Sequence, residues 1–367
     1  MRSASPSLFD LAVIGGGPAG SSAAITAARL GARVVLLEAR EFPRHKVCGE
    51  FVSAEALGVL AGLLREAPSA KSLFDNAPVM DRTRLLRGNR SLEAPVVPAA
   101  LSITRYDLDA ALWKAAQVAG LETRANCEVV ASDGDGPFRL QTSDGELGAK
   151  ALVVAAGRWS QFTADRSMPP GPKWIGLKAH FHESRPLRST DLYFFRHGYC
   201  GVQPVAADLV SACAMVRSDR ATSLQEVFAL HPQLAKRAAG WKAVTQPVST
   251  APLIYRPPQA TRGNVIFVGD AAAFIDPFAG DGISIALRSG EAAGQSIGRL
   301  LAGELTLAES VAAYRAEYAR QFVPLLSAAA RVRSLMSLPE FAKPAAFELL
   351  RFPGVIPFFM RKTRRAG

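Results

Sequence analysis

The feature that most constrains the fold is the stretch from Leu11 to Gly20, which reads LAVIGGGPAG. Its apolar residues predict a buried parallel strand, its glycines a tight turn, and the small residues after proline the start of a helix. The spacing Gly15-x-Gly17-x-x-Gly20 between strand and helix is the fingerprint of a dinucleotide-binding turn. Unpaired N–H groups at the helix start, together with the helix dipole, favour a bound pyrophosphate.

A carboxylate follows at the distance that such a turn requires. The segment from Arg33 to Leu37 predicts a second buried strand, and Glu38 follows it directly. An acidic side chain at this point accepts hydrogen bonds from the ribose of a bound dinucleotide. Strand, turn, helix, second strand and Glu38 together favour a Rossmann-type unit over an ordinary glycine turn.

The next loop allows a family to be suggested. KVCGE, from Lys46 to Glu50, is followed by a segment with helical periodicity, Ser53 to Leu64. The glycine turn, Glu38 and this loop resemble the geranylgeranyl reductase-like branch of the FAD-dependent monooxygenase superfamily, which has the p-hydroxybenzoate hydroxylase fold. The halogenase branch of that superfamily carries a related glycine-glutamate turn here. The resemblance extends over about Asp10 to Leu301 and implies FAD as the cofactor.

Later motifs extend the resemblance along the chain. An Arg before a helix, Arg105, is a recurrent flavin contact in that family, and the Asp of a Gly-Asp pair, here Asp270, hydrogen-bonds the ribityl chain. The sequence DPFAGDG, from Asp276 to Gly282, forms the turn at the isoalloxazine ring. The cofactor-binding residues implied in this way are Gly15, Gly17, Ala19, Gly20, Glu38, Ala39, Arg40, Cys48, Arg105, Gly157, Asp270, Pro277, Gly280, Gly282 and Ile283.

Cys48 is the candidate catalytic residue. The resemblance places it near the isoalloxazine ring, and its basic neighbours Arg44 and Lys46 would favour a thiolate. The alternative is a small packing residue in a tight loop. We expect His45 and Glu50, in the same loop, to be surface groups.

A second group of candidates comes from the most aromatic stretch, Tyr193 to Gly201. It resembles the strand and turn that cover the reactive face of the flavin and line the substrate cavity, although a hydrophobic sheet core would have the same composition. The substrate-lining candidates are Tyr193, Phe195, His197, Tyr199 and Phe278. Lys178, His180 and His182 alternate with apolar residues and therefore share one sheet face, for which we favour solvent over the cavity.

The predicted fold class is α/β: a doubly wound FAD-binding Rossmann-type domain with an inserted, mostly antiparallel β-sheet substrate domain and a helical C-terminus. The predicted FAD-binding domain is discontinuous and comprises residues 1–75, 101–170 and 249–305. The substrate domain comprises 76–100 and 171–248, and the C-terminal helical segment 306–367. A small meander with strands at 129–131, 138–142 and 145–149 precedes a separate buried strand from Ala151 to Ala155.

Composition limits the cellular context. The four cysteines show no metal-ligand spacing, and no signal peptide or membrane-spanning run is present, so we expect a cytoplasmic protein with reduced thiols and no bound metal. The net charge of +11 favours anionic partners. We expect no nucleic-acid partner, and a monomer or weak homo-oligomer. The C-terminal segment from Phe352 to Arg365 joins aromatic residues to a basic cluster, and two hypotheses remain for it: a structural tail, or peripheral contact with an anionic membrane.

These features predict an FAD-dependent oxidoreductase that acts on a small apolar substrate of isoprenoid, polyketide-like or aromatic type. Monooxygenation and double-bond reduction both remain open, with NADPH or NADH as the electron donor. In the resembling hydroxylases an Asp linked to nicotinamide use stands at the position of Ala156, which argues against conventional NADPH use here; Ser160 follows this turn. A non-catalytic carrier of a lipidic or prenylated partner is the alternative. A halogenase is a third hypothesis, and the sequence lacks that branch's signature GWxWxIP.

Overall fold

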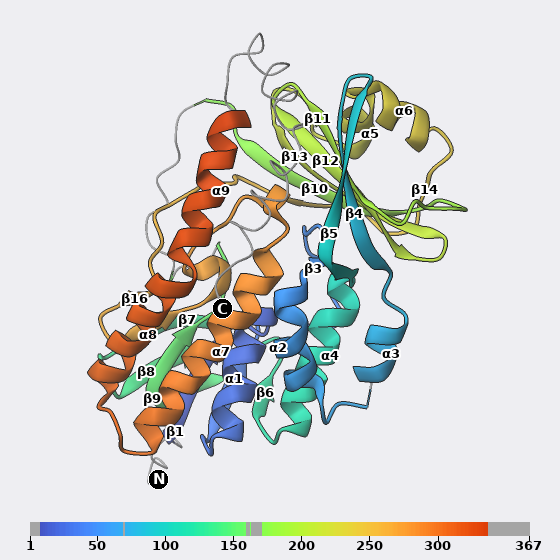
Figure 1. Cartoon of the computed structure of the whole chain (residues 1–367). Helices are drawn as coiled ribbons and strands as arrows, with labels where there is room; N and C mark the ends of the chain where they lie inside the picture. Colours follow the sequence, from blue (N-terminus) through green and yellow to red (C-terminus); the bar gives the residue numbers. More distant parts are fainter. Residues whose placement is uncertain (1–7, 69, 159–161, 163–170, 337–367) are drawn as a thin grey trace.

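Two mixed β-sheets, each covered by helices, make up this computed structural model, which describes residues 8–68, 70–158, 162 and 171–336. In Figure 1 the first sheet and most helices form the lower part of the molecule, and the second sheet lies above them on the right. Ser160 and the segment from Phe352 to Arg365 lie outside the described residues.

The first sheet has the order β16-β17-β9-β1-β2-β6, in which the five strands from β17 to β6 run parallel. This parallel arrangement confirms the predicted doubly wound α/β unit. Its strands are β1 (Leu8–Ile14), β2 (Val34–Leu37), β6 (Glu122–Arg124), β9 (Gly145–Val154), β16 (Thr261–Arg262) and β17 (Val265–Phe267). A meander of β7 (Val129–Asp133) and β8 (Phe138–Thr142) extends from β9.

One strand in this sheet differs from the expectation. The third meander strand and the buried strand from Ala151 are a single strand, β9, which pairs antiparallel with β8 at its start and parallel with β1 along most of its length. A continuous strand is possible because Lys150, at the predicted break, points outward to an ion pair with Asp10 while its neighbours remain buried.

The second sheet is mostly antiparallel and has the order β14-β10-β13-β12-β11-β4-β5-β3, with β15 beside β10. Its strands come from separate parts of the chain: β3 (Phe51–Val52), β4 (Val79–Arg87), β5 (Arg90–Ser102), β10 (Trp174–His182), β11 (Thr190–Phe195), β12 (Gly198–Ala206), β13 (Leu209–Arg217), β14 (Lys242–Ala243) and β15 (Val248–Thr250). The short helices α5 (Leu224–Ala229) and α6 (Pro232–Ala238) cover one face of this sheet (Figure 1). Its other face points toward the first sheet.

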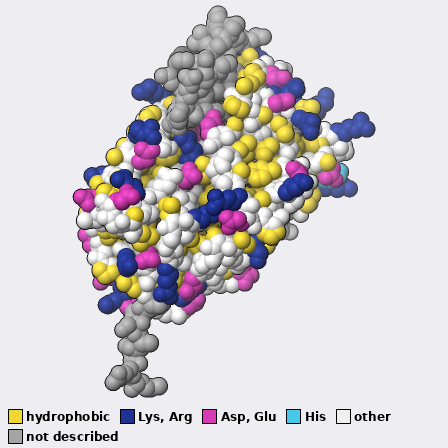
Figure 2. Space-filling view, turned by 60° about the horizontal axis from the view of Figure 1, so that its bottom comes forward, with side chains coloured by type: hydrophobic (Ala, Val, Ile, Leu, Met, Phe, Trp, Pro, Cys, Tyr) yellow, Lys and Arg dark blue, Asp and Glu magenta, His cyan; other side chains and the backbone are white. Residues whose placement is uncertain are grey.

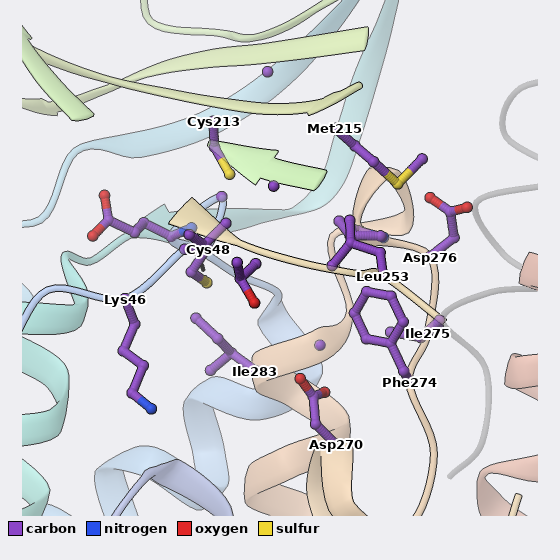
Figure 3. A pocket seen from close by; sticks show the side chains of 18 of the residues that line it. Lys46, Cys48, Cys213, Met215, Leu253, Asp270, Phe274, Ile275, Asp276 and Ile283 are labelled. Atoms are coloured by element: carbon purple, nitrogen blue, oxygen red, sulfur yellow. Dashed lines mark hydrogen bonds between the residues drawn. The ribbon is translucent and has the colours of Figure 1, made fainter. Parts of the chain in front are cut away.

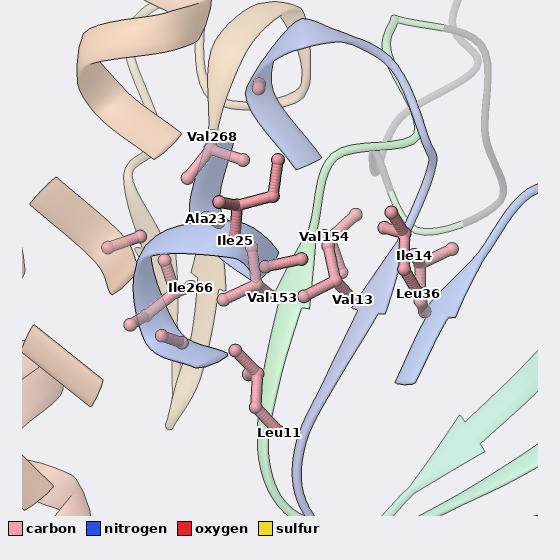
Figure 4. Close-up of a cluster of buried hydrophobic side chains, with 14 of the residues drawn as sticks. Leu11, Val13, Ile14, Ala23, Ile25, Leu36, Val153, Val154, Ile266 and Val268 are labelled. Atoms are coloured by element: carbon pink, nitrogen blue, oxygen red, sulfur yellow. The ribbon is translucent and has the colours of Figure 1, made fainter. Parts of the chain in front are cut away.

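The main core surrounds the parallel strands. Val13, Leu36 and Val153 lie beside one another at its centre, and Ile25 of α1 (Pro18–Arg29) covers them (Figure 4). The remaining helices are α2 (Ala54–Leu64), α3 (Ala70–Asp75), α4 (Arg105–Val118), α7 (Gly282–Leu301), α8 (Leu307–Gln321), α9 (Val323–Met336) and the 3-10 turns η1 (Gly269–Ala271) and η2 (Pro277–Ala279).

The described part of the C-terminus is helical as predicted, and it is divided into two helices at Phe322, where α8 ends and α9 begins. Pro324 explains the break, since it lacks the N–H that a continuous helix requires. Within the described ranges, no helix combines the length and hydropathy that crossing a membrane requires.

Positively and negatively charged side chains both occur on the face of the molecule that Figure 2 shows. Figure 2 shows basic and acidic side chains interspersed over one face of the molecule. The net charge of +11 is therefore not collected into a single basic patch on that face.

Helices α1 and α7 approach closely because three glycines on one side of α7 leave room for α1. A Cβ on Gly290 would lie 2.2 Å from the backbone oxygen of Ala19, and a Cβ on Gly294 would lie 2.6 Å from the Cβ of Thr26. Gly298 continues the row one turn further and faces Leu30. Both helices begin at glycine turns, so this contact fixes the distance between the two turns.

We predict that Gly294→Val separates α1 from α7 and lowers the free energy of unfolding by about 3 kcal/mol, the cost of strong overpacking. Gly58→Ala is the matched control, because Gly58 also lies within a helix but has no atom near its Cβ position. It should raise stability by about 0.5–1 kcal/mol. Urea unfolding, monitored by circular dichroism, measures the stability of both variants. A Gly294→Val protein as stable as the wild type would contradict the close contact.

Candidate active site

A cavity of about 1840 Å³ lies between the carboxyl ends of the parallel strands and the second sheet. This volume exceeds the roughly 300–1,000 Å³ of a site for one drug-sized ligand. In Figure 3 the loop with Lys46 and Cys48 lies on one side, Ile283 and Asp270 lie below, and Cys213 and Met215 come from the second sheet above. The cavity therefore joins the glycine turn to the sheet face.

The glycine turn has the geometry that its spacing predicts. Gly15 has a φ of +107°, and a Cβ on Gly20 would lie 1.8 Å from the Gly15 carbonyl oxygen. The N–H of Gly16 donates to Oε2 of Glu38 at 2.8 Å. Gly15 thus allows the turn, while Gly20 lies outside the cavity lining and permits contact between helix and strand.

Gly17 faces open space with positive charge around it. It is the N-cap of α1, whose first turn contains no acidic residue. A Cβ on Gly17 would lie 3.8 Å from a guanidinium nitrogen of Arg44 and equally far from one of Arg105. Helix N–H groups and two guanidinium groups around an open position fit the pyrophosphate of FAD.

Glu38 is buried and already heavily hydrogen-bonded. Besides the Gly16 amide, its carboxylate accepts the N–H of Arg40 at 3.1 Å and pairs with Arg44. Arg40 contributes its backbone only, since its side chain is exposed and outside the cavity lining, whereas Ala39 lines the cavity edge. A ribose would share the Glu38 carboxylate with Arg44, a residue that the sequence analysis did not select as a cofactor ligand.

The predicted flavin end of the cavity is assembled from four segments. Its lining includes Ala19, Gly157, Asp270, Pro277, Gly280, Gly282 and Ile283. Gly280 adopts a φ of +74°, and a Cβ there would lie 3.0 Å from the Phe51 ring. The N-terminus of α7 follows this turn and supplies unpaired N–H groups at the cavity wall. These features fit the ring system of FAD.

Cys48 lies in the cavity wall. Its sulfur accepts the backbone N–H of Glu50 at 3.4 Å. Burial alone would lower the pKa of Arg105, but ion pairing with Asp109 and a smaller interaction with Cys48 raise it, so a permanent cation lies beside the sulfur.

Glu50 is buried, which shows the expectation of a surface group to be wrong. Its carboxylate accepts from the Lys178 ammonium, from Nε2 of His180 at 2.8 Å and from the N–H of Arg105 at 2.8 Å. Lys178 and His180 are buried as well, so their sheet face is directed at this carboxylate and away from solvent. Only His182, at the end of the strand, is exposed as predicted.

This cluster of Glu50, Lys178 and His180, here called the ionic clamp, holds a strained residue. Glu50 has a φ of +62°, which is unfavourable for any residue with a side chain. Its carbonyl oxygen also accepts the N–H of Ile103 at 3.0 Å. These contacts fix the Cys48 loop between α4 and the second sheet.

The pKa values of Glu50, in the ionic clamp, and of the neighbouring His45 are both lowered. Burial alone would raise the pKa of Glu50, but hydrogen bonds and charge from His180 and Lys178 lower it to about 2. His45 packs against His180, with ring centroids 4.9 Å apart, and lines the cavity. Burial, followed by the charges of Lys178 and His180, lowers the pKa of His45 to about 4, so it is neutral near pH 7.

The aromatic candidates divide between the two faces of the second sheet. Phe195, His197, Tyr199 and Phe278 line the cavity. Tyr193 does not, and this part of the prediction is wrong: it is buried under α6, where its hydroxyl bonds Arg237 at 3.1 Å. Strand register explains the difference, because Tyr193 pairs with Cys200 whereas Tyr199 pairs with Phe194.

The apolar half of the cavity includes residues that the sequence analysis did not select. Met215, Leu253 and Phe274 pack beside Tyr199, and Tyr255 donates its hydroxyl hydrogen to Asp276 at 3.0 Å (Figure 3 shows Asp276 beside Met215). Arg333 of α9 reaches the same region. Of these additional residues, only Asp276 belongs to a motif that the sequence reveals, since it begins DPFAGDG.

Comparison with known proteins agrees with this geometry. Residues 10–105 match the family model described as FAD dependent oxidoreductase. A menaquinone reductase of Mycolicibacterium smegmatis is 28% identical over 369 residues, covering 90% of this chain and 85% of that enzyme. Digeranylgeranylglycerophospholipid reductase 1 of Methanococcoides burtonii is 26% identical over 305 residues, covering 78% of this chain and 74% of that enzyme.

Two further proteins are similar to this chain, one over only part of its own length and the other in fold. Conditioned medium factor receptor 1 of Dictyostelium discoideum is 26% identical over 321 residues, which are 77% of this chain but only 61%, less than two thirds, of that protein. The solved structure of the flavin-dependent brominase Bmp2 has a TM-score of 0.79 at 21% identity, covering 97% of this chain and 93% of that one. At this identity the brominase shows a shared fold.

These similarities support an FAD-dependent oxidoreductase, and the residues that line the cavity fit FAD as its cofactor. Its similar proteins include reductases, and solved structures with its fold include halogenases. The alternative of a non-catalytic carrier finds no support in these similarities.

We predict that Gly17→Val yields a folded protein without FAD, because the side chain enters the space beside Arg44 and Arg105 without meeting backbone. Gly20→Val is the control for misfolding, since its side chain would collide with the Gly15 carbonyl oxygen. Flavin absorbance per protein and circular dichroism measure the two effects. Retention of FAD by soluble Gly17→Val would refute the pyrophosphate position.

We predict that Glu50→Gln destabilises the protein at pH 7 by about 3–5 kcal/mol, because it leaves Lys178 buried without its counter-ion. Glu50 ionises more readily in the folded protein than in the unfolded chain, so its stabilisation is complete above pH 5 and is lost as the pH falls toward 2. The acid dependence of stability should therefore be shallower in Glu50→Gln, as measured by chemical unfolding at several pH values.

Asp219→Asn is the matched control for this prediction. The pKa of Asp219 is also lowered to about 2, chiefly by its hydrogen bond with Arg217, but this pair is at the surface and its removal should change stability little. The double variant with Glu50→Gln and Lys178→Met should recover part of the lost stability. Equal effects of the Glu50 and Asp219 substitutions would contradict a buried clamp.

Proposed function

We propose that this enzyme reduces a double bond of a small lipophilic substrate of the isoprenoid or prenylated quinone type, with NADPH or NADH as the electron donor. When bound, FAD supplies the two-electron chemistry that connects donor and substrate. The observation that carries the proposal is the single cavity, whose cofactor half opens into an apolar half against the second sheet.

The apolar half has the character of a site for a lipophilic molecule. Leu192, Phe194, Met215, Leu253 and Phe274 supply apolar and aromatic surface around it. Such walls bind by excluding water and impose little directionality on a hydrocarbon chain. A water-soluble, highly charged substrate would find few partners there.

Two further observations support reduction over the other reactions of this fold. The KVCGE loop resembles that of the reductase branch, and two similar curated proteins are named as reductases. The halogenase signature GWxWxIP is absent from the sequence, and the cavity-lining strand β12 contains no tryptophan.

The test uses purified FAD-loaded protein under anaerobic conditions, with NADPH or NADH and a menaquinone that carries an unsaturated prenyl chain. After the quinone ring has been reoxidised in air, the expected product retains two additional hydrogen atoms, which tandem mass spectrometry locates in the prenyl chain. A product with one added oxygen, formed only in air, would instead identify a monooxygenase. A halogenated product, formed only with bromide or chloride, would identify a halogenase.

We predict that Cys48→Ser retains FAD but lowers the rate of substrate reduction about 10²-fold, within the range for loss of a proton donor. The thiol has access to the cavity, while its lone pair is engaged by the Glu50 amide. Cys200→Ala is the control, because Cys200 is buried on the opposite face of the second sheet. If Cys48→Ser and wild type have equal rates in single-turnover absorbance measurements, the proton comes from another source, such as water.

A further inference from the structure

Tyr199 occupies a central position in the apolar half of the cavity. It lies on β12, opposite Phe194 of β11 and Met215 of β13. Its ring packs edge-on to Phe278, and only 3% of its surface is exposed. The residue is therefore fixed by its neighbours and has little freedom to turn its hydroxyl toward solvent.

The hydroxyl of Tyr199 has no hydrogen-bond partner within the part of the chain that the structure describes. Other buried tyrosines differ: Tyr193 bonds Arg237, Tyr255 bonds Asp276, and Tyr314 donates to the Phe267 carbonyl oxygen. Tyr318 also lacks a partner, but it lies between helices and not in the cavity wall. Buried polar groups in native proteins are nearly always satisfied, so the Tyr199 hydroxyl calls for a partner in the cavity.

The surroundings of Tyr199 define which partner fits. Burial, followed by the charge of Asp276, raises the pKa of Tyr199 well above its usual value, so its hydroxyl remains protonated and can donate. Both oxygens of Asp276 are occupied, by the Tyr255 hydroxyl and by the N–H of Phe278. The guanidinium of Arg333 lies over the Tyr255 ring and interacts with Asp276, so the two charges near Tyr199 offset each other and a neutral acceptor fits better than a carboxylate or phosphate.

We infer that the Tyr199 hydroxyl donates a hydrogen bond to a neutral carbonyl oxygen, of the ketone or quinone class, on the ligand in the apolar half of the cavity. This inference rests on the proposed function for the identity of that half as the substrate site. It makes Tyr199 the residue that distinguishes a carbonyl-bearing lipophilic molecule from a hydrocarbon of the same shape. Sites that contain a buried donor reject ligands that leave it unpaired.

The first measurement is a binding titration of the oxidised, FAD-loaded enzyme, followed by flavin absorbance. The two probes are a prenylated 1,4-naphthoquinone and the corresponding prenylated naphthalene, which lacks both oxygens. Wild type should bind the quinone at least about tenfold more tightly, the effect of one net hydrogen bond. Tyr199→Phe should reduce this preference to nearly one, while Tyr193→Phe, on the opposite face of the same sheet, should preserve it.

The second measurement separates binding from a structural role. Tyr199→Phe removes a buried oxygen without a protein partner and should raise the Tm of the ligand-free enzyme slightly, whereas Tyr193→Phe loses its bond to Arg237 and should lower it. Higher stability combined with a lost quinone preference supports the inference. A quinone preference that survives in Tyr199→Phe overturns it, as does loss of FAD from this variant, which would make the cofactor the partner.

These outcomes are independent of the reaction proposed above. An enzyme that binds the naphthoquinone through Tyr199 but does not reduce any double bond would refute the proposed reaction and preserve this inference. An enzyme that reduces the prenyl chain but binds the quinone and the naphthalene equally well would refute this inference and preserve the proposed reaction.

Discussion

The attachment of one buried carboxylate to a lysine and a histidine of a distant strand organises this molecule. Glu50 belongs to the loop that approaches the cofactor, while Lys178 and His180 belong to the second sheet. A carboxylate without these partners would be costly to bury, and the strained backbone of Glu50 would relax without them. The ionic clamp therefore fixes how the second sheet is placed over the Cys48 loop, and with it the shape of the cavity.

Most of the fold could be predicted because its signals are local. The glycine turn, Glu38 and the DPFAGDG motif each combine backbone requirements with a short spacing, and the alternating apolar runs define the strands. The single strand β9 and the break at Phe322 show the limits of this approach. In both cases the outcome depends on one residue, an outward-facing Lys150 or a proline at position 324, within an otherwise ambiguous pattern.

The site was less predictable because its decisive contacts are distant in sequence. Lys178 lies 128 residues from Glu50, and an alternating polar strand with no visible partner resembles a solvent-exposed face. The distinction between Tyr193 and Tyr199 depends on register across a hairpin, whose turn contains His197 at a φ of +64°. Composition singled out the aromatic stretch, but only the paired strands show which of its rings faces the cavity.

The two faces of the second sheet also bear on how such an enzyme can diverge. Leu192, Phe194 and Tyr199 line the cavity, whereas Tyr193, Cys200 and Val202 form part of the core under α5 and α6; Phe195 and Ala214 contribute to both. Exchange of a residue that faces only the cavity therefore leaves the packing of the opposite face intact, so ligand preference and folding are encoded by largely separate sets of positions. A lineage built on this sheet can explore new substrates with little loss of stability, which accords with the occurrence of one fold in both reductases and halogenases.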